Sequence, residues 1–544
     1  MAVSPLNDPR PKFLRPQLVG TRVGRGGGRL AGWALLALLG LGAGQPSTLR
    51  EIRLDTLRDK IEGGWAGQMI GVSFGAPTEF RYQERTIDGE LPPWTPANVE
   101  NALDQDDLYV DMTFAKVLDD KGLDASSDDF GAMLKDAKYR LWHANLAARR
   151  ALKRGVPGSQ SGLPGVNAHA NDIDFQIEAD FIGLMSPGLP QASNELCYRA
   201  GRVMNHGDGI YGGMFVSGMY AAAFFETDVR AVVEAGLRTL PARSPYALAI
   251  GDVLDWHRQH PNDWRATWKL IEGKWNAREP CPEGALRPFN IDAKLNGAYI
   301  ALGLLYGDGD FTKTLDVATR AGQDSDCNPS NALGVLGVMH GYERIPDVWK
   351  AGIPAIADTR FNYTAFTFRS IVASTERRAI ALATRHGGRV DATTLYVRTE
   401  APTPWRLELW DDYGSPRERV PVSDARWTFT GAWQAEASSN VRPGTYRTSA
   451  EKGAEARITF DGTGVIVAGR YLPTGGRADV YLDGRLDRTV DAYPDEDALK
   501  TGESLWHAFG LAPGTHTIRV VVRGERFGES TGADVSIEDL IVFR

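Results

Sequence analysis

The chain has 544 residues, enough for two or three domains, and a formal net charge of −8. This mildly acidic balance gives no support for nucleic-acid binding, which usually requires a basic surface. The three cysteines, Cys197, Cys281 and Cys327, are odd in number and widely spaced, so they indicate no disulfide framework, although a bridge between Cys197 and Cys281 stays open.

Residues 1–47 have the pattern of a secretory signal peptide. Basic residues between Arg10 and Arg29 precede an apolar run, Leu30 to Leu41, and the small residues that follow favour cleavage near Gly44. The run is too short for an ordinary membrane span. We therefore expect a secreted or periplasmic protein with no stable membrane anchor after cleavage; an uncleaved anchor is the alternative.

The stretch from residue 48 to about 385 is rich in alanine and leucine at helical spacing, interrupted by short loops with Gly and Pro. Amphipathic runs of this kind cover residues 139–154, 211–225, 229–237 and 295–305. An all-helical domain of this size can bury one large core.

A first cluster of acids lies at the predicted start of one of these helices. With Asp104 as the N-cap, Asp106 and Asp107 fall in the first turn, where the helix dipole and free backbone N–H groups favour carboxylates. Asp107 and Asp111 are then one turn apart on the same face. The apolar residues that follow predict a helix packed in the core.

A second cluster, Asp324 and Asp326 followed by Cys327 and Asn328, precedes a helix that we expect to open at Pro329. The spacing excludes an EF-hand, because Pro329 stands where that loop needs Gly. Acids gathered in this way need a cation between them, and carboxylates suit Mg²⁺, Mn²⁺ or Ca²⁺. The alternative is that both clusters are capping acids on a solvated rim.

The sequence pattern changes from helical to strand-like after residue 385. Residues 386–433 are expected to form a connecting strand region, and residues 434–544 a β-sandwich, because short β-branched runs alternate there with Gly-containing turns. The predicted strands are 454–460, 465–471, 478–482, 516–522 and 535–543. This end domain resembles the jelly-roll, galactose-binding-like modules that bind carbohydrate in secreted glycan-active enzymes.

Three stretches between about Leu57 and Ile345 resemble the ADP-ribosylglycohydrolase family. Gly67 to Glu79 is similar to the family's opening helix and loop, Gln105-Asp106-Asp107 stands where the family has Thr-Asp-Asp, and Gly322 to Asn328 stands where it has Gly-Asp-Thr-Asp-Thr-Asn. The resemblance implies a multidomain α and β protein in which an all-α catalytic bundle, residues 48–385, precedes the jelly-roll β-sandwich.

The resemblance also implies a two-magnesium centre. Its ligands would be Gln105, Asp106, Asp107, Asp324, Asp326 and Cys327. Gln105 and Cys327 replace family threonines, and a thiol is a poor ligand for Mg²⁺, so Mn²⁺ or Ca²⁺ stays open.

Further site residues come from the loops around this centre. Glu79 is the expected acid or base by resemblance, with Asp172 and Asp174 as further candidates for general acid or base catalysis. Asn171, Gln176 and His206 are expected to contact substrate. The alternative for the acids near position 172 is that they cap a solvated helix start. The alternative for His206 is a structural role.

The predicted function is metal-dependent hydrolysis of a glycosidic bond in an extracytoplasmic glycan or glycoside. A signal peptide together with a carbohydrate-binding-like module favours this substrate over intracellular ADP-ribosylated protein. A true ADP-ribosyl-protein hydrolase and a noncatalytic glycan-binding protein with a degenerate metal site remain the two alternatives.

Overall fold

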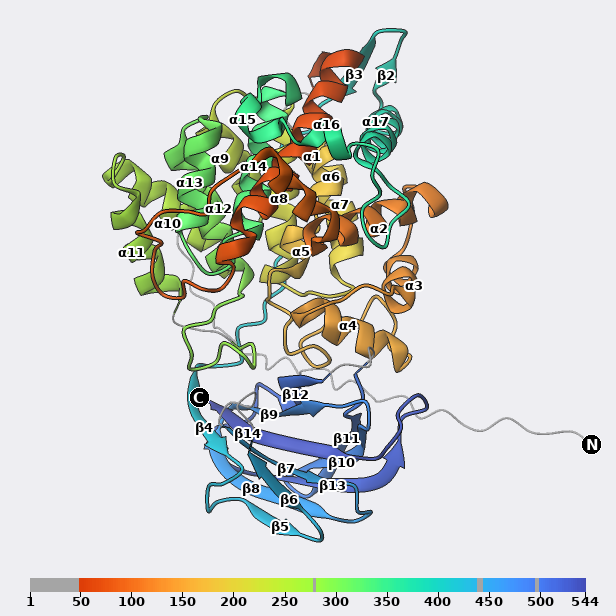
Figure 1. Ribbon diagram of the computed structural model, residues 1–544, viewed down its shortest axis with the longest axis vertical. Helices are drawn as coiled ribbons and strands as arrows, with labels where there is room; N and C mark the ends of the chain where they lie inside the picture. Colours follow the sequence, from red (N-terminus) through yellow and green to blue (C-terminus); the bar gives the residue numbers. More distant parts are fainter. Residues whose placement is uncertain (1–47, 277–279, 438–443, 495–498) are drawn as a thin grey trace, which may run out of the picture. The chain divides into compact units, whose positions relative to one another are not determined.

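The computed structural model describes residues 48–276, 280–437, 444–494 and 499–544 (Figure 1). The predicted signal peptide, residues 1–47, lies outside the described residues. Among the described helices, none is long and apolar enough to cross a membrane.

The first part of the described chain is helical, as predicted. Its helices, in chain order, are α1 (Leu54–Gly75), α2 (Asp106–Lys121), α3 (Ser127–Asp136), α4 (His143–Lys153), α5 (Asp174–Ile177), α6 (Asp180–Leu184), α7 (Pro190–Gly201), α8 (Asp208–Ala223), α9 (Val229–Arg238), α10 (Pro245–Gln259), α11 (Trp264–Trp275), α12 (Ala293–Gly307), α13 (Phe311–Arg320), α14 (Cys327–His340), α15 (Asp347–Lys350), α16 (Ile353–Ile356) and α17 (Phe368–Arg385). The most buried of them, α8, α12 and α14, are apolar almost all round, which is typical of helices at the centre of a large bundle.

The central packing is between α1 and α14, and glycines make it close. A Cβ atom on Gly67 would lie 2.1 Å from the carbonyl oxygen of Leu333, and one on Gly71 would lie 2.5 Å from that of Pro329. Only a residue without a side chain allows the two backbones to approach so closely. This contact brings the C-terminal end of α1 beside the N-terminal end of α14.

Two helix starts differ from the prediction by one or two residues. The N-cap of α2 is Gln105 rather than Asp104, because a 3-10 helix from Pro96 extends through Asp104 and delays the α-helix. Helix α14 begins at Cys327, two residues before Pro329. Proline has no backbone N–H, but the N–H groups of the first helical turn have no partner within the helix. The helix can therefore begin before Pro329 without losing a hydrogen bond. Asp106 and Asp107 do lie in the first turn of α2, as expected.

Strands follow the last helix. They are β2 (Arg389–Val390), β3 (Thr394–Arg398), β4 (Pro416–Pro421), β5 (Thr428–Thr430), β6 (Gln434–Ala437), β7 (Thr445–Ser449), β8 (Glu455–Gly462), β9 (Gly464–Tyr471), β10 (Gly476–Leu482), β11 (Arg485–Asp491), β12 (Lys500–Ala508), β13 (Gly514–Arg526) and β14 (Val535–Phe543). The first strand of the chain, β1 (Leu49–Arg53), pairs with β3, which also pairs with β2. This small sheet joins the two ends of the helical domain.

The remaining strands form two antiparallel sheets. Among the described residues one sheet has the order β11-β10-β13-β8-β5, and the other has β12-β9-β14-β7-β6 with β4 beside β14 (Figure 1). Strand β8 alternates buried and accessible positions, as expected for a strand with one face in a core. The predicted β-sandwich is present, and β4 and β5 of its sheets lie within the stretch predicted as a connecting region.

Candidate active site

The two acidic clusters meet at one pocket of about 270 Å³ in the helical domain. The described residues that line it are Glu79, Phe80, Asp104, Gln105, Asp106, Tyr109, Trp142, His143, Asn145, Ile173, Asp174, Ile177, Ile291, Asp324 and Cys327. Six of the residues predicted from the sequence therefore lie on its walls: Glu79, Gln105, Asp106, Asp174, Asp324 and Cys327.

Glu79 reaches the pocket because its loop is tied to the second cluster. The backbone N–H of Phe80 donates to the carbonyl of Gln323 at 2.9 Å, and the hydroxyls of Thr78 and Ser325 are 2.8 Å apart. Phe80 and Gln323 both have positive φ, 49° and 51°. Non-glycine residues rarely adopt this conformation, and such strain is concentrated at functional sites.

A thiol links the first cluster to the second. The Sγ atom of Cys327, the first residue of α14, donates to Asp107 Oδ2 at 3.3 Å. Asp107 is fully buried, and Asp324 and Asp326 are 1% and 2% exposed. The fold thus brings three or more carboxyl groups together in an interior that would normally exclude them.

The electrostatics of these groups reflect that crowding. Burial, with Asp326 next, raises the pKa of Asp106 to about 6, and burial together with Asp106 and Asp326 raises the pKa of Asp107 well above its usual value. Burial, then Asp326 and Asp106, also raises the pKa of Glu79. Glu79 is exposed at the pocket rim, so water there limits this rise.

The donor set fits a divalent cation. Asp107 Oδ1 and Asp324 Oδ1 are buried, and neither has a hydrogen-bond partner among the described residues. One ligand atom from each of Asp324, Asp326 and Cys327 lies within 4.8 Å of the others. A cation would neutralise the carboxylates and satisfy these oxygens, and hard oxygen donors suit such an ion.

Gln105 and Cys327, which were predicted as metal ligands, form hydrogen bonds with protein groups. Gln105 Nε2 donates to Asn101 Oδ1 at 2.8 Å, which leaves its amide oxygen unused by that bond. Burial, with Asp107 next, raises the pKa of the Cys327 thiol well above its usual value. The Cys327 thiol is a hydrogen-bond donor to Asp107, and sulfur is a poor ligand for a hard ion such as Mg²⁺.

Asp174 lies on the pocket wall at the start of α5. Its Oδ1 accepts the backbone N–H of Asn145 at 2.8 Å, while its buried Oδ2 has no described partner. Burial raises the pKa of Asp174 and, to a greater extent, that of Glu178, which accepts from the Asn145 side chain. The pocket therefore carries carboxyl groups both at its rim, from Glu79, and on its wall.

The other predicted residues are not among the described residues that line the pocket. Asn171 donates to the Trp410 carbonyl at 3.5 Å, and Gln176 accepts from the Tyr246 hydroxyl at 2.6 Å. His206 Nδ1 is 3.7 Å from a Glu408 carboxylate oxygen. Their roles in substrate contact remain predictions.

Asp172 is also set back from the pocket. It is fully buried and 2.7 Å from His169 Nδ1. The structure does not join Cys197 to Cys281: Cys197 Sγ lies 3.3 Å from Ser217 Oγ, and Cys281 Sγ lies 3.4 Å from His169 Nδ1.

Sequence reasoning missed several polar or aromatic residues of the pocket, among them Tyr109, Trp142, His143 and Asn145. Tyr109 has the spacing of a core residue of α2, and its position gave no sign of a pocket. Trp142 and His143 stand at the N-terminal end of α4. The predicted helical run began at residue 139, so the helix start at His143 was not available as a signal.

Comparisons with known proteins decide the family. A family model described as ADP-ribosylglycohydrolase matches residues 53–362, more than half of the chain. The chain belongs to the ADP-ribosylglycohydrolase family. It is thus a member of a family of metal-dependent enzymes that hydrolyse glycosidic bonds, and its acidic pocket lies within the matched residues.

Two curated proteins from Flavonifractor plautii are similar to part of this chain. An A type blood N-acetyl-alpha-D-galactosamine deacetylase is 40% identical over 104 residues, which are 19% of this chain and 13% of that protein. An A type blood alpha-D-galactosamine galactosaminidase is 36% identical over 104 residues, 19% of this chain and 9% of that protein. The chain thus spans a small part of either relative.

A solved structure of an ADP-ribosylglycohydrolase-related protein complex is 15% identical, with a TM-score of 0.39. The match covers 60% of this chain and 99% of that chain.

Proposed function

We propose that this protein is a secreted or periplasmic glycosidase that cleaves an extracytoplasmic glycan or glycoside with the help of two Mg²⁺ ions. The observation that carries the proposal is the convergence of Glu79, Asp106 and Asp324 at one pocket from three separate parts of the chain, with Asp107 and Asp326 close enough to interact with them. Export is supported by the basic and apolar pattern of residues 1–47.

The ligands of the metal centre would be Asp106, Asp107, Asp324 and Asp326, with the Gln105 amide oxygen as a further donor. A bound divalent ion supplies Lewis-acid and template chemistry to sugar hydroxyls. Because Cys327 donates a hydrogen bond to Asp107, we assign it to orienting that carboxylate rather than to the ion.

We assign Glu79 to move a proton at the scissile bond. Its raised pKa keeps a larger fraction of the carboxyl protonated near neutral pH, which is the state that a general acid needs. Asp174, held by the Asn145 N–H, presents a second carboxyl in the same pocket and is assigned to accept a proton from the attacking water. Most glycoside hydrolases use such a pair of carboxyl groups.

A sugar substrate is supported by the wall that faces these acids. The indole of Trp142 lines the pocket and is 43% exposed. Lys500 Nζ lies over this ring at 5.5 Å from its centroid, so the ring is only partly covered. A partly exposed aromatic ring beside carboxylates suits a sugar, because the apolar face of the sugar stacks on the ring while its hydroxyls bind polar groups. The relatives from Flavonifractor plautii are named for amino-sugar glycans, so an α-linked galactosaminide belongs in the first substrate panel.

The test is an assay of the purified protein on an α-galactosaminide, on plant and microbial oligosaccharides and on an ADP-ribosylated peptide, each with Mg²⁺ and with EDTA. We expect sugar release that EDTA abolishes and that Glu79→Gln lowers at least a hundredfold, consistent with loss of a general acid. Asp316→Asn, a change on the surface of α13, is the matched control and retains activity.

Each other outcome identifies a rival function. Release of ADP-ribose at a higher rate than any sugar would assign the protein to ADP-ribosyl-protein hydrolysis. Binding of oligosaccharide without any release would assign it to noncatalytic glycan binding.

A further inference from the structure

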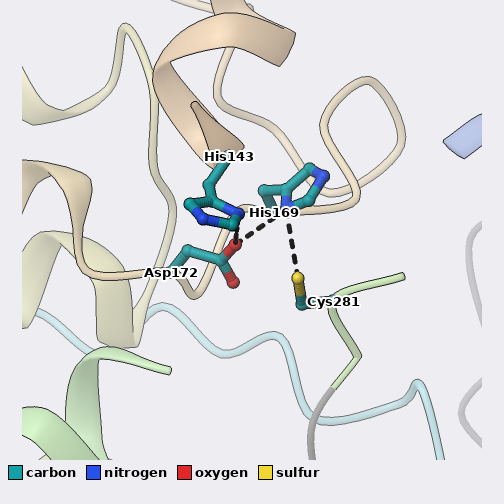
Figure 2. Close-up of side chains that lie close together, drawn as sticks. All are labelled: His143, His169, Asp172 and Cys281. Atoms are coloured by element: carbon teal, nitrogen blue, oxygen red, sulfur yellow. Dashed lines mark hydrogen bonds and ion pairs between the residues drawn. The ribbon is translucent and has the colours of Figure 1, made fainter. Parts of the chain in front are cut away.

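A second cluster of possible metal ligands lies behind the pocket wall and differs in chemistry from the carboxylate centre. It consists of His143, His169, Asp172 and Cys281 (Figure 2). Each residue offers one ligand atom, and these atoms all lie within 4.8 Å of one another.

The four side chains come from three separated segments. His143 is the first residue of α4, His169 and Asp172 belong to the loop before α5, and Cys281 lies between α11 and α12. Figure 2 shows both imidazole rings beside the Asp172 carboxylate, with the Cys281 thiol below His169. His169, Asp172 and Cys281 are almost fully buried, and His143 is half-buried.

The contacts inside the cluster bring nitrogen, oxygen and sulfur atoms with lone pairs close to one another. His169 Nδ1 is 2.7 Å from Asp172 Oδ2 and 3.4 Å from Cys281 Sγ, and His143 Nδ1 is 3.9 Å from the same Asp172 oxygen. A neutral ring nitrogen can donate one hydrogen or accept one, so Nδ1 of His169 cannot bond fully to both neighbours. Asp172 Oδ1 is buried with no described partner.

Backbone strain points to the same place. His143 has a φ of 40°, a conformation that a residue with a β-carbon rarely adopts. The ring of this residue lies beside the Asp172 carboxylate (Figure 2). The cost of such strain is usually retained where a side chain must hold a set position.

We propose that His143, His169, Asp172 and Cys281 bind one Zn²⁺ ion. Two imidazoles, a thiolate and a carboxylate are zinc's preferred ligands, whereas Mg²⁺ avoids sulfur. Tetrahedral Zn²⁺ with bonds of about 2.0–2.3 Å separates its ligand atoms by roughly 3.3–3.7 Å. The side chains need shift by only about an ångström to reach that geometry, and Cys281 gives up its proton on binding.

The site is structural rather than catalytic. Four protein ligands fill a tetrahedral sphere and leave no position for water or substrate. His143 also lines the acidic pocket, so the ion fixes one wall of that pocket and ties the segment around Cys281 to α4. Glu283, whose Oε2 is 3.2 Å from His143 Nδ1, is the competing partner of that ring.

The experiment begins with the unmodified full chain. Protein stripped with a chelator and reloaded with Zn²⁺ should retain one equivalent of zinc after dialysis in the presence of excess Mg²⁺. Its zinc-edge X-ray absorption should show one sulfur and three nitrogen or oxygen neighbours. Because this measurement uses no variant, a folding defect cannot obscure it. An oxygen-only shell, or no retained zinc, overturns the proposal.

Variants then locate the ion. Cys281→Ala and His169→Ala should lose the retained zinc and the thermal stabilisation that zinc gives, while Glu283→Gln and Cys197→Ala should keep both. Cys327→Ala and Asp324→Asn alter the carboxylate centre and should also keep the zinc. Loss of zinc in Cys327→Ala with retention in Cys281→Ala would place the ion in the acidic pocket and refute the second site. These outcomes do not depend on whether the protein cleaves a glycoside.

Discussion

Cys327 Sγ lies 3.3 Å from Asp107 Oδ2, and the two residues are 220 positions apart in the sequence. This one contact joins the start of α2 to the start of α14 and closes the carboxylate cluster. Because both helix N-termini point into the same space, their dipoles favour negative charge there. Partial positive charges at two helix ends cannot balance this many carboxyl groups, however, and Asp107, Asp324 and Asp326 are buried, so a divalent ion remains the natural counter-charge.

The first prediction concerns this counter-charge. Mg²⁺ at a hundred times its dissociation constant should stabilise the wild-type protein by about 2.7 kcal/mol, since the ion binds the folded state alone. Asp324→Asn should abolish that stabilisation because it removes a carboxylate from the centre of the cluster. Thermal unfolding with and without Mg²⁺ measures the effect.

Asp316→Asn provides the control, because Asp316 pairs with Arg320 on the surface of α13. An Mg²⁺-dependent melting shift of equal size in Asp324→Asn and wild type would remove Asp324 from the metal centre.

The second prediction concerns the thiol itself. Cys327→Thr should strengthen Mg²⁺ binding by about tenfold, because a hydroxyl can orient Asp107 as the thiol does and can also offer an oxygen to the ion. Isothermal titration calorimetry of Mg²⁺ into both proteins checks the affinity. Cys197→Ser changes another buried thiol, one that contacts Ser217, and should leave affinity unchanged. Weaker binding in Cys327→Thr would mean that the thiol geometry is needed.

Local sequence patterns predicted both acidic helix starts, since runs of acids before apolar helical residues have a clear physical reason. They also predicted the five strands that became β8, β9, β10, β13 and β14, which alternate or are β-branched. Strands β6, β7, β11 and β12 of the sandwich were not predicted. Strand β11 is almost wholly accessible, so it has no apolar face to detect, and β12 carries Gly502 and polar residues.

The pocket walls could not be predicted in the same way. Trp142, His143 and Asn145 face the acids only because α4 packs beside α5, a long-range contact that no local pattern records. Conversely, Gln176 and Asn171 are polar residues near the site in sequence that the fold uses for internal hydrogen bonds. The cluster around His169 is likewise assembled from three distant segments, so it has no sequence signature.

The third prediction tests the close packing that brings the acids together. Gly71→Ala should destabilise the protein by about 1–3 kcal/mol, because the new methyl group would overlap the Pro329 backbone and push α14 away from α1. It should also weaken Mg²⁺ binding, since α14 carries the second cluster. The measurements are the apparent melting temperature and the Mg²⁺-dependent shift.

Gly251→Ala is the matched control for that change. Gly251 is also inside a helix, α10, but a Cβ there has no atom within 4 Å. Replacing it should stabilise the protein by about 0.5–1 kcal/mol through helix propensity alone. A Gly71→Ala protein as stable as Gly251→Ala would show that α1 and α14 tolerate a wider spacing.

The fourth prediction uses a buried acid of the β-sandwich, Glu538. Its Oε2 accepts the Gly502 N–H at 2.9 Å, while Oε1 has no described partner, and burial raises its pKa from 4.5 to about 8. An acid whose pKa is raised in the folded state binds its proton more tightly there than in the unfolded chain. The free energy of unfolding therefore falls as the pH rises from about 4.5 to 8, and the whole loss is present above pH 8. Glu538→Gln keeps the acceptor without the charge.

Glu538→Gln should therefore melt at a higher temperature than wild type at pH 8.5, while the two proteins should melt alike at pH 4, where wild-type Glu538 is protonated. Glu525→Gln is the control, because Glu525 is exposed and paired with Arg523 at 2.9 Å, and an exposed pair contributes little at either pH. Differential scanning calorimetry at both pH values compares the three proteins. A pH-independent difference between Glu538→Gln and wild type would show that the substitution acts through packing and not through the proton.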